Sequence, residues 1–255
     1  MQARLQGKVI VVAGAGGIGD ELARRYAGEG ASVVLGDLDG AAARAVADEI
    51  VAAGGNATGI ELDGADEESV KQTVNLAVSA FGGLDGFHAN FASFKDGGSA
   101  DDVLGMSLDI CDEVMHVNTR GFVLCTRHAV PAMLARGGGS MVYTGSGAAY
   151  IGEPVRVGYA MSKAAIHALM RHVATRFGPQ GIRANVIAPG VIAHPRFEAV
   201  VSPEIAETFK KVTALKTRLG SSRDIAAMGA LLMSDEGSFI TGQVISVDGG
   251  NTMRP

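Results

Sequence analysis

The chain has 255 residues, of which 47% are hydrophobic, 19% are charged and 36 are glycine. This composition excludes an intrinsically disordered chain, and the length fits one large α/β domain. The formal net charge of −5 argues against nucleic acid as a main partner, because no basic stripe is present to neutralise phosphates.

Strand-length apolar runs alternate with helical stretches from the start of the chain to its end. The predicted strands are 9–13, 32–36, 58–62, 84–89, 140–144, 183–188 and 243–247. The predicted helices are 18–29, 41–53, 67–81, 108–135, 159–177 and 223–233, with Asp66 and Ser222 as N-caps of two of them. Because the strands are continuously apolar, helices should cover both of their faces. We therefore predict a doubly wound, Rossmann-like parallel sheet of seven strands in a single domain over residues 1–255.

The first predicted strand runs directly into a glycine-rich turn and then a helix start. Gly14, Gly16, Gly17 and Gly19 lie in this turn, with Ile18 between the last two. Glycine lets the backbone approach a pyrophosphate closely, and a helix N-terminus presents free N–H groups to that anion. This pattern in this context predicts a dinucleotide-binding loop formed by these five residues.

An acidic residue ends the second predicted strand. Asp37 lies eighteen residues after Gly19 and is followed by Leu38. A carboxylate at this spacing can accept a hydrogen bond from a ribose 2′-OH and would repel a 2′-phosphate. Since the glycine turn also contains no Arg or Lys, the sequence favours NAD over NADP, with Asp37 and Leu38 as cofactor contacts.

Tyr159 and Lys163 are four residues apart on a predicted helix, and Ser146 lies thirteen residues before Tyr159. Positions i and i+4 share a helix face, so an ammonium group can lie beneath a phenol. A free phenol has a pKa near ~10, and a neighbouring cation lowers it. Such a tyrosine can exchange a proton with an alcohol oxygen. The pair alone is common on helix surfaces, so its meaning depends on the rest of the chain.

Taken together, the glycine turn, Ser146, Tyr159, Lys163 and the Pro189 and Gly190 turn resemble the short-chain dehydrogenase/reductase family over essentially the whole chain. The resemblance implies interconversion of alcohols and carbonyls with a nicotinamide cofactor. It implies that Tyr159 is the acid/base, that Lys163 lowers the tyrosine pKa and binds the nicotinamide ribose, and that Ser146 holds the substrate oxygen.

The resemblance also assigns supporting residues and reveals departures. It implies that Asn118 anchors a water in a proton relay, and it implies cofactor contacts from Asp63 and Gly64 at the adenine, Asn90 near the ribose, and Pro189, Val191 and Ile192 at the carboxamide. The glycine turn is one residue shorter than the family pattern. In addition, the family's Asn-Asn-Ala-Gly is here Ala89, Asn90, Phe91 and Ala92, so that this loop carries an unusual Phe. His194 replaces a carboxamide-binding Thr, and Gly145 replaces a Ser.

Residues 193–219 are predicted to form a substrate lid. Its apolar side chains are Phe197, Val200, Val201, Ile205, Phe209 and Leu215, and further cleft residues are expected from Phe91, Phe94, Tyr150, Ile151 and Val155. An apolar cleft favours a hydrophobic secondary alcohol or ketone, although the same side chains are also suited to packing against other subunits. Two alternatives stay open: an NADP-linked 3-oxoacyl-type ketoreductase, and a nonenzymatic NAD-binding sensor.

Cellular setting and assembly follow from weaker signals. Cys111 and Cys125 are the only cysteines and have no metal-ligand spacing, so we expect small core thiols, no metal site and a cytoplasmic location. The chain contains no apolar run long enough to cross a membrane and no signal-peptide pattern. The family resemblance implies a homotetramer with helices 108–135 and 159–177 at its interfaces.

Overall fold

The computed structural model describes residues 3–96, 102–194, 197, 199 and 201–253. One seven-stranded sheet has the order β3-β2-β1-β4-β5-β6-β9, and every paired neighbour is parallel. The strands are β1 (Val9–Ala13), β2 (Ser32–Asp37), β3 (Asn56–Glu61), β4 (Gly86–Ala89), β5 (Gly139–Thr144), β6 (Ile182–Pro189) and β9 (Val244–Val247). The predicted doubly wound α/β fold is confirmed, with strand boundaries shifted by a residue or two.

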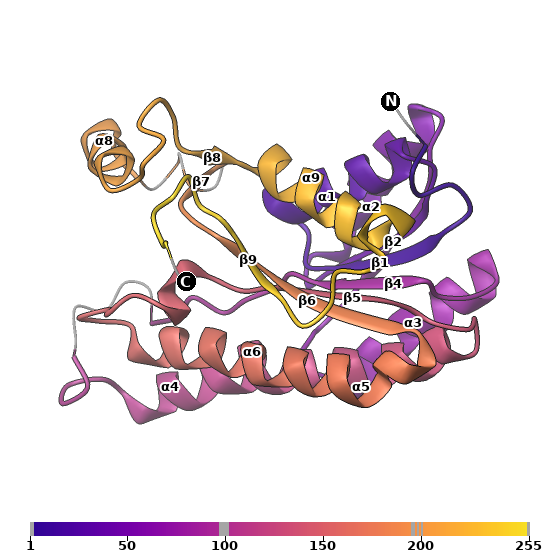
Figure 1. Ribbon diagram of the computed structural model, residues 1–255, viewed down its shortest axis with the longest axis horizontal. Coiled ribbons are helices and arrows are strands. Elements are labelled where there is room, and N and C mark those ends of the chain that lie inside the picture. Colours follow the sequence, from indigo (N-terminus) through magenta and orange to yellow (C-terminus); the bar gives the residue numbers. More distant parts are fainter. Residues whose placement is uncertain (1–2, 97–101, 195–196, 198, 200, 254–255) are drawn as a thin grey trace.

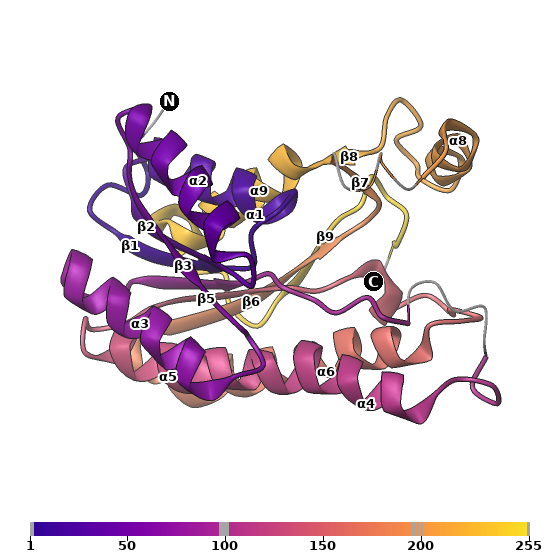
Figure 2. The same ribbon diagram turned by 180° about the vertical axis from the view of Figure 1, so that it is seen from behind.

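Helices cover both faces of the sheet, as Figures 1 and 2 show. One layer holds α1 (Ile18–Gly28), α2 (Gly40–Ala52) and α9 (Ser222–Met233), and the other holds α3 (Glu67–Phe81), α5 (Gly121–Leu134) and α6 (Val157–Phe177). Alternate residues of β1 therefore enter two different cores: Val11 packs with the α3 and α5 layer, whereas Val12 packs with the α1 and α9 layer. This double burial explains why a central strand such as β1 is apolar at every position.

The predicted helix 108–135 is interrupted. It consists of α4 (Leu108–Met115), a π-helical turn over His116–Arg120 and α5. A π turn adds a residue to the helical period and is often found at functional sites. Asn118 lies in the middle of this turn and its side chain is fully buried. The predicted helical stretch is therefore present over residues 108–134, but it contains a π turn at the segment that carries a candidate site residue.

Helix ends follow simple capping chemistry. The Asp66 side chain accepts from the Ser69 N–H at 2.7 Å and caps α3, as predicted. The N-cap of α9 is Ser221, one residue before the predicted Ser222, and both its N–H and its hydroxyl donate to Asp224 at 2.8 and 2.9 Å. The α9 cap is thus a reciprocal capping box, in which the third helical residue binds back to the cap.

The predicted lid contains short elements. Its ends pair as a two-residue parallel ladder between β7 (Ile192–Ala193) and β8 (Gly220–Ser221). Between them, α8 (Pro203–Lys211) stands away from the sheet (Figure 1), and none of its described residues is buried. Val200, which was expected to line the lid, is outside the described residues. Short 3-10 turns lie at Gly147–Ala149, Gly178–Gln180 and Asp235–Gly237.

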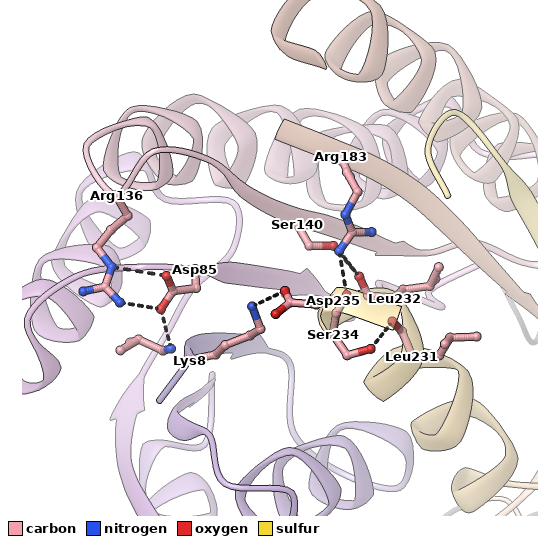
Figure 3. Close-up of polar contacts among 10 residues, drawn as sticks. Lys8, Asp85, Arg136, Ser140, Arg183, Leu231, Leu232, Ser234 and Asp235 are labelled. Atoms are coloured by element: carbon pink, nitrogen blue, oxygen red, sulfur yellow. Dashed lines mark hydrogen bonds and ion pairs between the residues drawn. The ribbon is translucent and has the colours of Figure 1, made fainter. Parts of the chain in front are cut away.

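A polar cluster joins the amino ends of the strands to the end of α9, far from the lid (Figure 3). Arg183, at the start of β6, donates to the carbonyl oxygens of Leu232 and Ser234 at 2.6 and 3.3 Å. The Asp85 carboxylate forms an ion pair with the Arg136 guanidinium at 3.1 Å, and the Lys8 ammonium forms one with Asp235 at 2.7 Å. A cation at a helix C-terminus also complements the helix dipole, so this cluster fixes α9 against the sheet.

Candidate active site

The carboxyl ends of β1 and β4 are neighbours at the point where the strand order reverses. The backbone N–H groups of Asn90 and Phe91, which follow β4, both donate to the Ala13 carbonyl oxygen, at 2.8 and 3.0 Å. Ligands of open α/β sheets bind at such a switch point. The predicted glycine turn and Asn90 are therefore brought together at one place.

Close packing requires glycine at two positions of the turn. A Cβ on Gly14 would lie 2.6 Å from the Phe91 nitrogen, and one on Gly19 would lie 1.9 Å from the Gly14 carbonyl oxygen. Gly14, Gly16 and Gly17 all have positive φ, which side chains disfavour. The turn leads directly into α1, whose first residue is Ile18. The shortened turn thus still delivers a helix N-terminus to the crevice.

Asp37 binds the glycine turn directly. Its carboxylate accepts from the Ala15 N–H at 2.8 Å and from the Asp39 N–H at 3.0 Å. A carboxylate has about four lone-pair sites, so it keeps acceptor capacity for a ribose hydroxyl. Leu38 beside it is 71% exposed. These residues and the turn fit a dinucleotide.

The Ser146 hydroxyl lies close enough to the Tyr159 phenol to lower the pKa of that phenol. Ser146 follows β5, and Tyr159 lies in the first turn of α6 and is only 8% exposed. The Ser146 hydroxyl also accepts from the Ala148 N–H at 3.1 Å. The exposed ring of Phe94 stacks on the Tyr159 ring with centroids 5.2 Å apart. The two predicted catalytic hydroxyl groups thus converge beneath an apolar ring.

The Lys163 side chain is buried on the core side of Tyr159. Its ammonium donates to the Thr144 carbonyl oxygen at 2.9 Å and lies 5.7 Å from the centroid of the Tyr159 ring. Burial lowers the pKa of Lys163 to about 7. The lysine is therefore on the expected helix face, one turn from the phenol, but its direct hydrogen bond is to the end of β5.

The balance at Tyr159 differs from the expectation based on Lys163. Burial is the largest effect and raises the pKa of Tyr159, whereas the Ser146 hydrogen bond and the Arg156 charge lower it. The Arg156 guanidinium lies 5.9 Å from the Tyr159 ring centroid. Arg156 is therefore a second cation beside the phenol, at a distance from the ring similar to that of Lys163.

Sequence reasoning missed Arg156 and Asp96. Arg156 precedes α6 in the left-handed conformation with φ of 57° and pairs with Glu153 at 3.1 Å. The buried carboxylate of Asp96 accepts from the Tyr159 N–H at 2.8 Å and so caps the first turn of α6. Neither had a local signal, because Asp96 comes from the loop after β4 and left-handed arginine has no sequence pattern.

Asn118 binds the loop after β4 and the helix α6. Its amide accepts from the Ser93 N–H at 2.6 Å and donates to the Ser93 carbonyl at 3.1 Å and to the Ser162 hydroxyl at 3.2 Å. The Ser162 hydroxyl in turn donates to the Tyr159 carbonyl oxygen at 2.7 Å. Asn118 thus holds the backbone on both sides of Tyr159, and its role toward a water stays a prediction.

Phe91 points into the core, which corrects its expected place in the cleft. Its ring meets the Phe122 ring edge-on at 5.0 Å and packs with the α3 and α5 core. A Cβ on Gly64 would lie 2.3 Å from the Phe91 ring, and one on Gly121 would lie 2.9 Å from it. Gly64 is therefore explained by this packing. Its neighbour Asp63 accepts from the Ala65 N–H at 2.8 Å.

The remaining predicted contacts surround the carboxyl end of β6. Gly190, between Pro189 and Val191, donates to the Val247 carbonyl at 3.1 Å, and Ile192 is buried. The His194 ring lies over the glycine turn, 2.8 Å from where a Gly17 Cβ would be. His194 therefore places the segment after β6 beside the glycine turn.

A cavity of about 470 Å³ lies among the residues of the predicted lid and the β7–β8 ladder. Phe197 and Val201 line it as predicted, together with Lys210 and Arg218. Ser146, Tyr159 and Lys163 are not among the described residues that line it. Tyr150 stacks on His167 at 4.8 Å, while Ile205 and Leu215 are exposed. Only part of the predicted apolar set therefore encloses a common space.

Three further expectations are answered by the described residues. Among them, no helix is long and apolar enough to cross a membrane, and no group of His, Cys, Asp or Glu is arranged to hold a metal ion. Cys125 is buried as predicted, but Cys111, on α4, is only half-buried.

Comparison with known proteins agrees with this geometry. Residues 12–252 match the family model described as enoyl-(acyl carrier protein) reductase. A probable short-chain type dehydrogenase/reductase of Bradyrhizobium diazoefficiens is 40% identical over 248 residues, which is 97% of this chain and 88% of the relative. The cyclohexanol dehydrogenase of an Acinetobacter species is 36% identical over 259 residues, covering 100% of this chain and 98% of the relative.

A solved structure is also similar over nearly the whole chain. The structure of 7α-hydroxysteroid dehydrogenase complexed with NADH and 7-oxo glycochenodeoxycholic acid has a TM-score of 0.91 and 33% sequence identity, and the match covers 99% of this chain and 97% of that one. The fold and site define an oxidoreductase of the dinucleotide-binding α/β class. The chain belongs to the short-chain dehydrogenase/reductase family.

Proposed function

We propose that this protein is an NAD-linked oxidoreductase that interconverts a hydrophobic secondary alcohol and its ketone. The observation that carries the proposal is the placement of Ser146, Tyr159 and Lys163 at the carboxyl end of the sheet, where Ser146 acts on the Tyr159 phenol and Lys163 binds the end of β5. A nonenzymatic NAD sensor would have no need for this arrangement. The glycine turn between β1 and α1 supports a dinucleotide as the cofactor.

The preference for NAD rests on Asp37. Its carboxylate lies against the glycine turn through the Ala15 N–H, where it would accept from a ribose hydroxyl and repel a 2′-phosphate. The solved relative is complexed with NADH, which supports the same class of cofactor. Within the described glycine turn, residues 14–19, there is no Arg or Lys to bind a 2′-phosphate.

The protein's residues would act on the substrate oxygen and its proton. The nicotinamide cofactor, when bound, accepts or supplies the hydride. In oxidation the Tyr159 phenolate takes the hydroxyl proton, and in reduction the Tyr159 phenol returns it. Ser146 donates a hydrogen bond to the same oxygen, and one such donor is worth about 3 kcal/mol in the transition state. Asp96 and Asn118 hold the backbone that orients Tyr159.

The substrate class follows from the apolar surroundings of Tyr159. Phe94 stacks on its ring, and Val114 and Ala148 pack beside it. The apolar lid residues Phe197 and Val201 line a separate cavity, which Tyr159 does not line. The relatives named for cyclohexanol and for a hydroxysteroid support an alicyclic alcohol.

The exposed apolar side chains of Leu108 and Val123 on α4 and α5 support the homotetramer that we also propose.

Cofactor choice is tested by fluorescence titration with NADH and NADPH. We expect NADH to bind at least about ten-fold tighter, because a 2′-phosphate would lie beside the Asp37 carboxylate. Asp37→Ser should reduce the difference between the affinities for NADH and NADPH while leaving the fold intact. Tighter binding of NADPH by the natural chain would instead favour the NADP-linked 3-oxoacyl-type ketoreductase, which the acyl carrier wording of the family model also suggests.

Substrate class is tested with a panel of secondary alcohols and NAD⁺, scored by NADH absorbance. Alicyclic and other apolar alcohols should give the highest kcat/KM, because the lining near Tyr159 offers them burial worth about 25 cal/mol per Å². A polar sugar alcohol of similar size is the control. Higher kcat/KM for the sugar alcohol would contradict the proposed substrate class.

A further inference from the structure

A buried chain of side-chain hydrogen bonds runs across the sheet beneath the crevice. The Tyr26 hydroxyl on α1 lies 2.8 Å from Nδ1 of His88 on β4, and His88 Nε2 lies 3.0 Å from the Thr144 hydroxyl at the end of β5. Thr144 then donates to Oδ1 of Asn90 at 2.8 Å, and the Asn90 amide donates to the Gly14 carbonyl at 2.9 Å. The chain ends on the glycine turn.

The strand period explains why these side chains meet. His88 and Asn90 are two residues apart along β4 and the residue after it, so their side chains leave the same face. Val142 on β5 is paired with His88, which places Thr144 beside Asn90 on that face. Tyr26 reaches the same face from α1, within the core formed by α1 and α9.

The direction of every bond in the chain is determined by its last member. The Gly14 carbonyl can only accept, so the Asn90 amide nitrogen faces it and the Asn90 oxygen faces Thr144. The Thr144 hydroxyl donates its one proton to that oxygen, so it must accept a hydrogen bond from the His88 ring. His88 therefore carries its proton on Nε2, and its bare Nδ1 accepts from Tyr26.

This series of hydrogen bonds does not transfer protons at neutral pH. Tyr26 and His88 are both completely buried, and burial lowers the pKa of His88 to about 3. Burial also raises the pKa of Tyr26. Both groups keep one protonation state across the physiological range, so the chain is a fixed connection between elements rather than a relay.

The two ends of the chain enclose the glycine turn. Gly14 opens the turn, and α1, which carries Tyr26, begins where the turn ends. Thr144 also accepts the Lys163 ammonium on its backbone carbonyl at 2.9 Å, so one residue supports both the turn and the lysine. We infer that Thr144 and His88 are positioning residues that hold the glycine turn in its dinucleotide-binding shape through the Asn90 amide. This inference rests on the proposed function.

Thr144→Val and Thr144→Ser test the inference as a matched pair. Valine keeps the shape but removes the hydroxyl, leaving both His88 Nε2–H and the Asn90 oxygen buried without their partner, whereas serine keeps the hydroxyl. We expect Thr144→Val to weaken NADH binding about ten-fold, while Thr144→Ser binds within about two-fold of the natural chain. Both variants keep the backbone carbonyl for Lys163, so kcat at saturating cofactor should change much less than the Kd for NADH.

A purely structural role would give a different result. Thr144→Val would then lower the thermal midpoint but leave the Kd for NADH unchanged, which would overturn this inference alone. A natural chain that binds neither NADH nor NADPH would overturn the proposed function as well. Tyr26→Phe is a second variant for the case that Thr144→Val does not fold. It keeps the ring, removes only the far donor, and should weaken NADH binding several-fold.

An independent test needs no cofactor. Nitrogen-15 NMR of histidine-labelled protein reports which ring nitrogen of His88 carries the proton. We expect the Nε2–H form with no titration between about pH 5 and 8. An Nδ1–H form, or a ring that titrates in that range, would overturn the directional chain even if NADH binds normally.

Discussion

Tyr159 is surrounded by charges of both signs that act on one phenol. Arg156 lowers the pKa of Tyr159, whereas Asp96 and Glu153 raise it, against a larger upward effect of burial. Lys163 is buried on the other side, and its pKa is itself lowered to about 7. The proton affinity of the proposed acid/base is therefore set by residues on the segment just before α6 as well as by the helix itself.

This balance predicts opposite pH shifts for two neighbouring variants. Oxidation needs the Tyr159 phenolate, so its rate rises with pH through the tyrosine pKa. Arg156→Gln removes a cation, raises that pKa and should move the rise in kcat/KM to higher pH. Glu153→Gln removes an anion, lowers the pKa and should move the rise to lower pH. The pH profile of alcohol oxidation measures both, and shifts of the same sign would contradict this account.

Residues at regular spacing were predictable at this scale, and residues brought from elsewhere were not. Tyr159 and Lys163 follow the i, i+4 rule on α6, and Ser146 lies close enough to lower the pKa of Tyr159. Asp96 contacts Tyr159 although the two are 63 residues apart in the sequence. The sequence gives no sign that His88 differs from its buried strand neighbours, because its partners Tyr26 and Thr144 come from other segments.

At the scale of elements, the loop after β4 depends on glycines in two other segments. The Phe91 ring fills the space that side chains at Gly64 and Gly121 would occupy. One bulky residue beside the cofactor site is thus compensated by missing side chains after β3 and at the start of α5.

Gly64→Val should destabilise the fold by about 1–3 kcal/mol, because its Cβ would overlap the Phe91 ring. Phe91→Ala should also cost stability by leaving a cavity. The double variant should be more stable than the sum of the two losses predicts, by at least about 1 kcal/mol. Urea unfolding of the four proteins measures this coupling. Losses that simply add would show that the two residues do not compete for one space.

The strand-helix alternation could be predicted because the central strands are buried on two faces and each long helix on one. Elements without such periodicity could not. The ladder between β7 and β8 is only two residues long, which leaves no pattern. The π turn at His116–Arg120 is also invisible in the sequence, since its residues are compatible with an ordinary helix.

For the whole molecule, the buried histidine predicts a loss of stability in mild acid. His88 is neutral in the folded chain because burial lowers its pKa from 6.5 to about 3. The unfolded chain binds this proton more readily, so its contribution to stability is full above about pH 6.5 and falls as the pH drops toward 3. Between pH 6.5 and 4.5 the free energy of unfolding should fall by about 2–3 kcal/mol from this group.

Urea unfolding across that pH range measures the effect, with His88→Leu as the control. The variant is expected to be less stable at pH 7, because Tyr26 and Thr144 lose their partner, but to show a flatter dependence on pH. Equal slopes for the two proteins would mean that His88 is not the group that titrates.

The central claim is that Tyr159 exchanges the proton of a substrate oxygen beside a bound dinucleotide. Comparing Tyr159→Phe with the natural chain, in alcohol turnover and in NADH binding, tests it most directly. The account predicts that the variant loses at least about 100-fold in kcat while its Kd for NADH stays within about three-fold. A variant that keeps more than about a tenth of its turnover would contradict the claim.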